Sequence, residues 1–398
     1  MTTLILSHYT LTTAAGYGIN ENLTALQTGH SGLKHNDFLD GDLDTFIGRV
    51  NGIEKEKLPG HLTAYECRNN LLAYLAFQQD DFINAINSAK QQYGSNRIGV
   101  FLGTSTSGIL ESELIYQSEN YKKSGFFPEN FHFKERHNSF SISDFVRTYM
   151  QLEGPALVVS TACSSSAKVF ATAYRYIQLG LCDAAIVGGV DSLCHTTLYG
   201  FNALELVSGK PCKPADKDRD GLSIGEAAAF ILLEKKNTMR NSDSTVFLHG
   251  YGESSDAYHM SSPHPEGKGA SLAMQQALNT SGLTAHEIDY INLHGTATPV
   301  NDRVEDAAIN QVFKNKVKCS STKGWTGHTL GAAGGVEAIY STLSLEHNFM
   351  PQSLNTENID PEIHQKVLLH SEHTKIKHVA SNSFGFGGNN CCLIFSKC

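Results

Sequence analysis

The 398-residue sequence lacks several features that would place it in particular classes of protein. It has no run of basic residues longer than a pair and a formal net charge of −9, which argues against nucleic acid as the main partner. No stretch approaches the roughly 18 apolar residues of a membrane span. The first residues, MTTLILSHYTLTTAAGYG, have no charged leader region and are typical of a first strand and its turn, not of a signal peptide.

Motifs for metals and nucleotide cofactors are also missing. The sequence has no Cys-x-x-Cys pair and no His-Glu-x-x-His segment. Residues 216–227 begin like a calcium loop, but Ala227 takes the last ligand position, where a Glu is required. The glycine-rich segment 381–390 does not fit the dinucleotide fingerprint, and 103–108 is not a nucleophile elbow. We therefore expect no bound metal or cofactor.

The nine cysteines do not form a disulfide pattern. Their odd number, without the spacing of small secreted domains, is typical of free thiols in a reducing cytoplasm, where we expect this protein to be located. Five lie in or beside apolar strand-like runs and are predicted to be inert core residues: Cys182, Cys194, Cys319, Cys391 and Cys392.

What the sequence does contain is an alternation of strand and helix patterns. Short apolar runs at residues 97–103, 156–160 and 184–190 predict buried strands. Between the last two, apolar residues recur with the helical period, and Gly180 ends the pattern: Val169, Phe170, Ala173, Tyr174 and Ile177. Strands and helices in this order predict an α/β fold.

A second unit of the same plan occurs later in the chain. Residues 158–180 and 317–348 each have a strand ending in small hydroxyl residues, an entry rich in small residues, and an apolar helix. The second helix carries the stripe Val336, Ile339, Tyr340 and Leu343. We favour an internal duplication, although any two βα units are somewhat alike. The polar break at 234–245 predicts two halves, 1–240 and 241–398.

Cys163 is the first candidate for chemistry. It lies between a predicted strand and a predicted helix, where unpaired N–H groups and the helix dipole favour an anion. This position predicts a lowered thiol pKa and a nucleophilic role. The alternative is a small buried residue in a tight turn.

Three more strand-to-helix or strand-to-turn corners carry candidate partners. His294 opens the segment HGTATP, and His328 lies in KGWTGHTLGAAGG at the corner equivalent to that of Cys163. A lone histidine is more often structural, but two at matching corners favour a shared site. The loop 381–390, SNSFGFGGNN, has the glycines that bring N–H groups close to a ligand, as in an oxyanion hole.

With these segments the chain resembles the elongating, Cys-His-His class of β-ketoacyl-[acyl carrier protein] synthases of the thiolase superfamily. TACSSS is similar to the nucleophile motif, HGTATP and KGWTGHTLGAAGGVEA to the two histidine motifs, and SNSFGFGGNN to the C-terminal glycine loop. KPADKDRDG and SSDAYHMSSP resemble two further segments of the family. The resemblance implies a duplicated thiolase fold with five layers, α-β-α-β-α.

The resemblance also implies an activity. Cys163 would take an acyl chain from an acyl carrier protein, and malonyl-[acyl carrier protein] would lose carbon dioxide and attack the bound thioester to give 3-oxoacyl-[acyl carrier protein]. His294 and His328 would hydrogen-bond the developing enolate oxygen as neutral donors. Phosphopantetheine would arrive on the carrier protein rather than as a resident cofactor.

Other matched positions take the roles that the family gives them. Lys323 and Glu337 match a charged pair behind the histidines, expected to orient them and balance charge. The backbone N–H groups of Cys163 and Phe386 match the oxyanion hole, and Phe386 also matches a gating residue. Two hydroxyl residues match contacts to the phosphopantetheine arm: Thr296 and Thr298.

The chain also departs from the family pattern. Ala297, Asn389, Trp325 and Lys213 stand where the family usually has other residues. Thr106 matches a lining residue of the acyl pocket at the dimer interface. This pattern favours a specialised pathway, such as aryl polyene or other polyketide-like synthesis. The alternatives are housekeeping fatty acid elongation and, from another class, a non-catalytic chain-length-type partner subunit, against which Cys163 argues.

The expected partners follow from the same resemblance. Acyl carrier proteins are acidic, so a locally basic docking patch is expected despite the negative net charge. Arg68, Lys210 and Lys213 are candidates, although each could equally be an ordinary solvated residue. Members of the family form homodimers, and some pair with a catalytically inactive relative.

Overall fold

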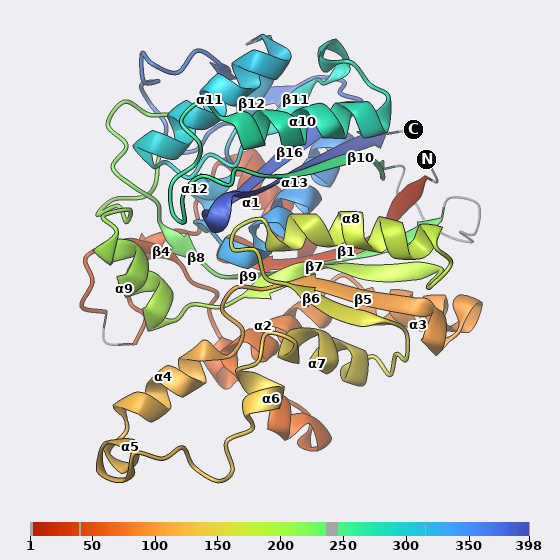
Figure 1. Ribbon diagram of the computed structural model, residues 1–398, viewed down its shortest axis with the longest axis vertical. Coiled ribbons are helices and arrows are strands. Elements are labelled where there is room, and N and C mark those ends of the chain that lie inside the picture. The colour runs from red at the N-terminus through yellow and green to blue at the C-terminus, as the bar shows by residue number, and fades with distance from the viewer. Residues whose placement is uncertain (1–2, 40, 236–245, 315, 398) are drawn as a thin grey trace.

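A large sheet in two halves organises the molecule (Figure 1). The computed structural model describes residues 3–39, 41–235, 246–314 and 316–397. The first half-sheet contains β1 (Leu4–Thr13), β5 (Ile98–Gly103), β6 (Ala156–Val159), β7 (Ala184–Asp191) and β9 (Ala227–Lys235). The second contains β10 (Val246–Ser255), β11 (Tyr290–Asn292), β12 (Lys318–Ser320), β14 (Lys366–Val367), β16 (His378–Gly385) and β17 (Asn389–Lys397).

The two half-sheets share one topology. The first has the order β1-β9-β7-β5-β6 and the second β10-β17-β16-β11-β12, with β14 added at the edge. In both, the first strand along the chain lies beside the fifth, and the second, third and fourth run parallel to one another. The repeated order confirms the duplicated α/β fold. The halves join where β1 pairs with β10 at Leu4–Leu248 and Ile5–Phe247.

Helices complete the five layers. Between the half-sheets lie α8 (Ser165–Gln178) and α13 (Ala333–His347), which pack on each other and on strands of both halves. The outer layers contain α2 (Arg68–Phe77), α3 (Phe82–Tyr93) and α7 (Ser141–Tyr149) on one side, and α10 (Lys268–Ser281) and α11 (Pro299–Phe313) on the other. Because α13 is buried on every side as far as Leu345, its sequence is apolar or small all round.

Smaller elements surround these layers. A projecting arm contains α4 (Ile109–Gln117), α5 (Glu119–Ser124) and α6 (Phe133–Arg136). The remaining α-helices are α1 (Gly18–Thr28), α9 (His195–Ala203) and α12 (Lys323–Thr326). The short strands are β2 (Gly16–Tyr17), β3 (Lys34–His35), β4 (Phe46–Gly48), β8 (Ile224–Gly225), β13 (Phe349–Met350) and β15 (Glu372–His373). Six 3-10 turns are described: Ile53–Lys55, Gly60–Tyr65, Ser95–Arg97, Ala285–Glu287, Leu330–Ala332 and Phe386–Gly388.

The local predictions agree with these elements. The runs at 97–103, 156–160 and 184–190 are β5, β6 and β7, and the apolar stripe that follows β6 is α8. The five cysteines predicted to be inert are all buried. Most of the polar break at 234–245 lies outside the described residues, which leave out 236–245, so the boundary at residue 240 stays a prediction. Among the described residues, none of the helices combines the length and apolar character that crossing a bilayer requires.

Candidate active site

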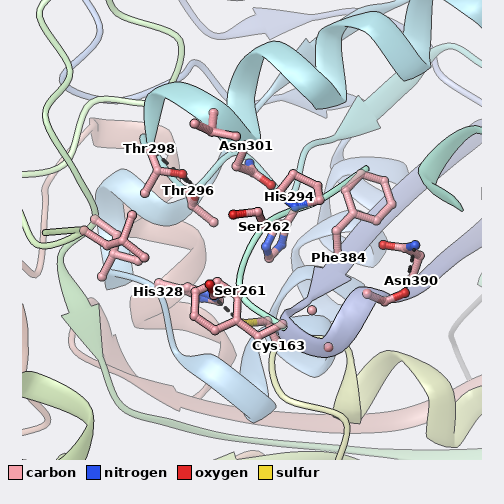
Figure 2. A pocket seen from close by; sticks show the side chains of 18 of the residues that line it. Cys163, Ser261, Ser262, His294, Thr296, Thr298, Asn301, His328, Phe384 and Asn390 are labelled. Carbon is pink, nitrogen blue, oxygen red and sulfur yellow. Dashed lines mark hydrogen bonds between the residues drawn. The ribbon is translucent and has the colours of Figure 1, made fainter. Parts of the chain in front are cut away.

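Four chain segments that follow strands meet around Cys163 (Figure 2). Cys163 follows β6, His294 follows β11, Lys323 and His328 follow β12, and Phe386 follows β16. The carboxyl ends of parallel strands lie at one edge of each half-sheet, so strand order gathers the corners that follow β11, β12 and β16. The packing of α8 on α13 between the half-sheets brings the Cys163 corner to them. The duplicated fold therefore assembles the predicted residues from distant parts of the chain.

Cys163 lies in a tight corner ahead of the central helix. It is 4% exposed, and its Sγ lies 3.0 Å from Nε2 of His328. The preceding residue, Ala162, has a φ of 51°, in the left-handed region that residues with a side chain seldom adopt. The backbone N–H groups of Phe386 and of Cys163 itself point at the sulfur. These two N–H groups are therefore placed to hydrogen-bond the carbonyl oxygen of an acyl group attached to the sulfur, when that oxygen becomes negative.

The thiol pKa differs from the sequence-based expectation. The position before α8 predicted a lowered pKa, whereas burial raises the pKa of Cys163 to about 11. Lys323 and the Phe386 N–H act in the opposite direction but do not outweigh the loss of water around the sulfur. The expectation of a lowered pKa is therefore wrong, and the resting form at neutral pH is the thiol.

The two histidines form an edge-to-face pair in the same buried space. Their ring centroids are 5.3 Å apart with an interplanar angle of 82°. Burial and the nearby Lys323 ammonium hold the pKa of both imidazoles well below the usual range, and His328 adds to the effect on His294. Both rings are therefore neutral at physiological pH, as expected for hydrogen-bond donors to an enolate oxygen.

Lys323 and Glu337 form a buried ion pair behind the histidines. The Lys323 ammonium donates to Oε1 of Glu337 and to the backbone carbonyl of His294. Burial raises the pKa of the Glu337 carboxyl to about 7, and Lys323 opposes this rise. The pair links the His294 corner to α13, so it is placed to orient one histidine relative to the other.

Two buried carboxylates that the sequence analysis missed hold these corners. Glu305 accepts from the backbone N–H groups of His294 (2.9 Å) and Gly295 (2.8 Å). Asp191, at the end of β7, accepts from the N–H groups of Thr106 (2.9 Å) and Gly331 (2.5 Å). Asp191 directly follows the apolar run 184–190 that predicts a buried strand, and this adjacency was its signal. Glu305 lies on the buried face of α11, for which no helix was predicted.

A cavity of about 120 Å³ leads to the sulfur and both histidines. Thr296 and Thr298 line it, and their hydroxyl groups hydrogen-bond each other at 2.8 Å. Phe386 also lines it, with its ring 5.3 Å from that of Phe201. Two lining residues were not predicted: Val300 and Asn301. Four others lie in segments that the resemblance singled out without giving each residue a role: Ser261, Ser262, Phe384 and Asn390.

The remaining predictions have different outcomes. Thr106 is buried, lies outside this cavity and donates from its N–H and hydroxyl to Asp191 Oδ1 at 2.9 Å, and its place in an acyl pocket at a dimer interface stays a prediction. Arg68 is 6% exposed and donates to Glu226 and Glu54, so it is a buried ion-pair residue and not a docking residue. Lys210 is exposed, and Lys213 is partly exposed beside Asp216.

The donor set of the site could also hold a metal ion. Cys163 Sγ and one ring nitrogen of each histidine lie within 4.8 Å of one another. A soft divalent ion accepts such a set, but the buried Lys323 ammonium next to it opposes a second positive charge. The expectation that the protein binds no metal stays a prediction.

The arrangement defines a class of protein: a thiolase-like α/β fold with a buried cysteine and two histidines at a shared cavity. The family model described as β-ketoacyl synthase, N-terminal domain, matches residues 78–239, and the C-terminal domain model matches residues 246–357. A 3-oxoacyl-[acyl-carrier-protein] synthase 2 from Staphylococcus aureus is 31% identical over 389 residues, covering 87% of this chain and 92% of that protein. The chain therefore belongs to the β-ketoacyl synthase family.

Two further proteins are similar. A mitochondrial 3-oxoacyl-[acyl-carrier-protein] synthase from Arabidopsis thaliana is 41% identical over 262 residues, which cover 62% of this chain and 57% of the length of that protein. Among solved structures, a ketosynthase from Xenorhabdus doucetiae, in complex with its chain length factor, is 37% identical with a TM-score of 0.90. That likeness covers 100% of this chain and 98% of the other.

Proposed function

We propose that this protein condenses a Cys163-bound acyl chain with malonyl-[acyl carrier protein], with loss of carbon dioxide, to give 3-oxoacyl-[acyl carrier protein]. The observation that carries the proposal is the buried cluster of Cys163, His294 and His328 at the end of one cavity, with two backbone N–H groups on the sulfur. A thiol and two neutral imidazoles supply a nucleophile and donors for a developing negative charge.

The first half-reaction is transfer of the acyl chain. Sγ of Cys163 attacks the carbonyl carbon of the acyl thioester, the bond from that carbon to the carrier sulfur breaks, and the thiol proton leaves with the carrier thiol. The nearest base to Sγ is Nε2 of His328 at 3.0 Å, which is placed to hold the proton during transfer. The N–H groups of Cys163 and Phe386 stabilise the carbonyl oxygen as it becomes negative.

The second half-reaction forms the carbon–carbon bond. The malonyl thioester loses carbon dioxide, and the electron pair left behind forms an enolate whose oxygen accepts hydrogen bonds from His294 and His328. The enolate carbon attacks the Cys163 thioester, the carbon–sulfur bond breaks, and the released thiolate takes up a proton from water. Neutral rings suit this role because a donor fixed in advance needs no reorganisation when charge develops.

Neighbouring groups support these steps. Lys323 and Glu337 orient the histidines and balance charge. Phe386 acts as a gate at the cavity, where its ring meets Phe201. Phosphopantetheine enters on the carrier protein, with its arm along Thr296 and Thr298. Lys210 and Lys213 remain the candidates for contact with an acidic carrier protein.

We further propose a specialised pathway, aryl polyene or polyketide-like, in the cytoplasm. The 37% identity to a ketosynthase solved with a chain length factor supports the specialised role, and eight free, buried cysteines among the described residues support a reducing compartment. The 41% identity to a mitochondrial 3-oxoacyl-[acyl-carrier-protein] synthase favours the second candidate, housekeeping fatty acid elongation. Either role implies a dimer, with itself or with a related subunit.

The direct test is acyl transfer to the thiol. The protein is incubated with a panel of acyl carrier proteins bearing fatty or polyene acyl chains, and its intact mass is measured. We expect the acyl mass on the wild-type protein and on Cys182→Ala, which removes a buried thiol away from the cavity, and none on Cys163→Ala. Acylation or condensation by Cys163→Ala would show that the assignment is wrong. The preferred acyl chain separates the two pathways.

A further inference from the structure

One wall of the active-site cavity is a single chain segment that runs from its floor to its mouth. Exposure rises along this segment from 2% at His294 to 58% at Val300. Thr296 and Thr298 lie between them, and Asn301, in the first turn of α11, continues the wall. Figure 2 shows the Asn301 side chain beside Thr298 and directed into the cavity. A linear ligand attached at Cys163 therefore passes the threonine hydroxyl groups before it reaches Asn301.

The carboxamide of Asn301 is oriented by a buried network. Its Nδ2 donates to Asp302 Oδ1 at 3.2 Å, which determines the direction of the amide group. Asp302 is itself held by the N–H of Ala215 at 2.9 Å and by Arg219 at 3.3 Å. In the part of the chain that the structure describes, no group donates to Oδ1 of Asn301. Its oxygen and its second N–H are thus free to pair with a ligand.

The Asn301 oxygen can accept a hydrogen bond and its second N–H can donate one. Together they match the N–H and the C=O of an amide in a ligand. The facing wall is also polar and uncharged where Ser261 and Ser262 line the cavity. Pantetheine carries two amides, one two carbons from the sulfur and one three carbons further along the arm. Thr296 and Thr298 are buried whereas Asn301 is partly exposed nearer the mouth of the cavity, so the second amide falls towards Asn301.

We propose that Asn301 binds the pantetheine amide that lies farther from the sulfur. The inference rests on the proposed function, because it assumes that a pantetheine thioester is the substrate. Oδ1 accepts from the amide N–H, and Nδ2 donates its second hydrogen to the amide carbonyl. Asn301 is a substrate-binding residue in this role and takes no part in bond making.

The test compares two thioesters that differ in the second amide. Malonyl-pantetheine has both amides, whereas malonyl-N-acetylcysteamine has only the one near the sulfur. For Asn301→Leu we expect KM for malonyl-pantetheine to rise about three- to tenfold, the range that one or two neutral hydrogen bonds provide, with kcat unchanged. KM for malonyl-N-acetylcysteamine should stay within about twofold. Asn301→Gln should recover part of the loss, and Asn310→Leu, exposed on the same helix, should match the wild type.

Other outcomes would overturn the proposal. Equal losses with both thioesters would indicate a general disturbance of the site, and no loss with either would show that Asn301 does not bind the arm. A wild-type protein that condenses neither thioester would instead contradict the proposed function. In that case protection of Cys163 from alkylation by S-methylpantetheine still decides the role of Asn301. Weaker protection in Asn301→Leu supports the role, and equal protection rejects it.

Discussion

At the scale of single residues, Cys163 must act as a nucleophile although burial disfavours its anion. With a pKa raised to about 11, the thiolate is a very small fraction of the resting enzyme near pH 7. Lys323 is the largest of the groups that lower this pKa. Its ammonium also bonds Glu337 and the His294 carbonyl, so one buried charge serves both the sulfur and the histidines.

The role of Lys323 predicts a shift in the pH dependence of alkylation. In the wild-type protein the rate at which iodoacetamide modifies Cys163 should rise about tenfold per pH unit below the thiol pKa, because the thiolate is the reactive form. Lys323→Met removes the charge that lowers this pKa, so we expect alkylation at pH 8 to be about tenfold slower. The measurement is the alkylation rate between pH 7 and pH 9, read by mass spectrometry.

A control separates charge from loss of the ion pair. In the single variant Glu337 is left without its ion-pair partner. The double variant Lys323→Met with Glu337→Gln also removes that carboxylate, and it should show the same slow alkylation as the single variant. An unchanged rate in Lys323→Met would mean that the ammonium has no influence on the thiol.

The sequence was enough to predict which residues react and that they lie together. It was not enough to predict the pKa of the Cys163 thiol or the ion pair of Arg68. The cysteine and the two histidines stand in local motifs that short segments reveal. The direction of the Cys163 pKa depends on how completely the rest of the fold excludes water. Similarly, Arg68 looked like a surface cation because its partner Glu226 lies 158 positions away in the sequence.

At the scale of elements, the contact between α8 and α13 sets the distance between the thiol and its histidine. Gly334 on α13 lies against Ala167 on α8, and a Cβ added at Gly334 would come within 2.6 Å of the Ala167 backbone nitrogen. Cys163 lies two residues before the first of these helices, and His328 lies two residues before the short turn Leu330–Ala332 that leads into the second. Close approach of two backbones therefore keeps Sγ and Nε2 in contact.

A methyl group at this crossing should disturb both stability and activity. We expect Gly334→Ala to lower the free energy of unfolding by about 1–3 kcal/mol, because the buried layer has no room for the added group. It should also slow acylation of Cys163 as the helices move apart. Urea denaturation and the acylation rate give the two readouts.

The matched variant is Gly200→Ala on the exposed helix α9. No atom lies within 4 Å of the position of its added Cβ, and alanine is the better helix former, so stability should stay equal or rise by about 0.5–1 kcal/mol. Equal stability of Gly334→Ala and the wild type would mean that α8 and α13 can move apart enough to accommodate the added methyl group without loss of packing.

The elements around the site were predictable where periodicity is strong. Strands β5, β6 and β7 and helices α8 and α13 follow from short local patterns. The projecting arm of α4, α5 and α6 and the anchoring role of Asp191 did not follow. Asp191 ends a strand whose pattern predicts burial, but its partners come from two other segments that only the tertiary fold brings together.

At the scale of the whole molecule, the sheet ends at an apolar edge. Strand β6 is the last strand of the first half-sheet, and its four residues, ALVV, are only half-buried. An edge of this kind presents unpaired backbone groups and tends to pair with another strand. Cys163 follows the same strand, so pairing along β6 would bring the second subunit close to the active site.

This edge predicts that the protein works as a dimer. The purified chain should sediment at about twice its mass of 43.3 kDa, or do so once a related ketosynthase-like subunit is added. Ser160 is exposed at the end of the edge, so Ser160→Arg should place a long charged side chain in the interface and yield folded monomers, whose unfolding midpoint is lower because association no longer stabilises them. Asn310→Arg, exposed on the outer helix α11, should leave the dimer intact. A wild-type protein that stays monomeric under both conditions would contradict the predicted dimer, and a Ser160→Arg variant that still dimerises fully would place the interface elsewhere.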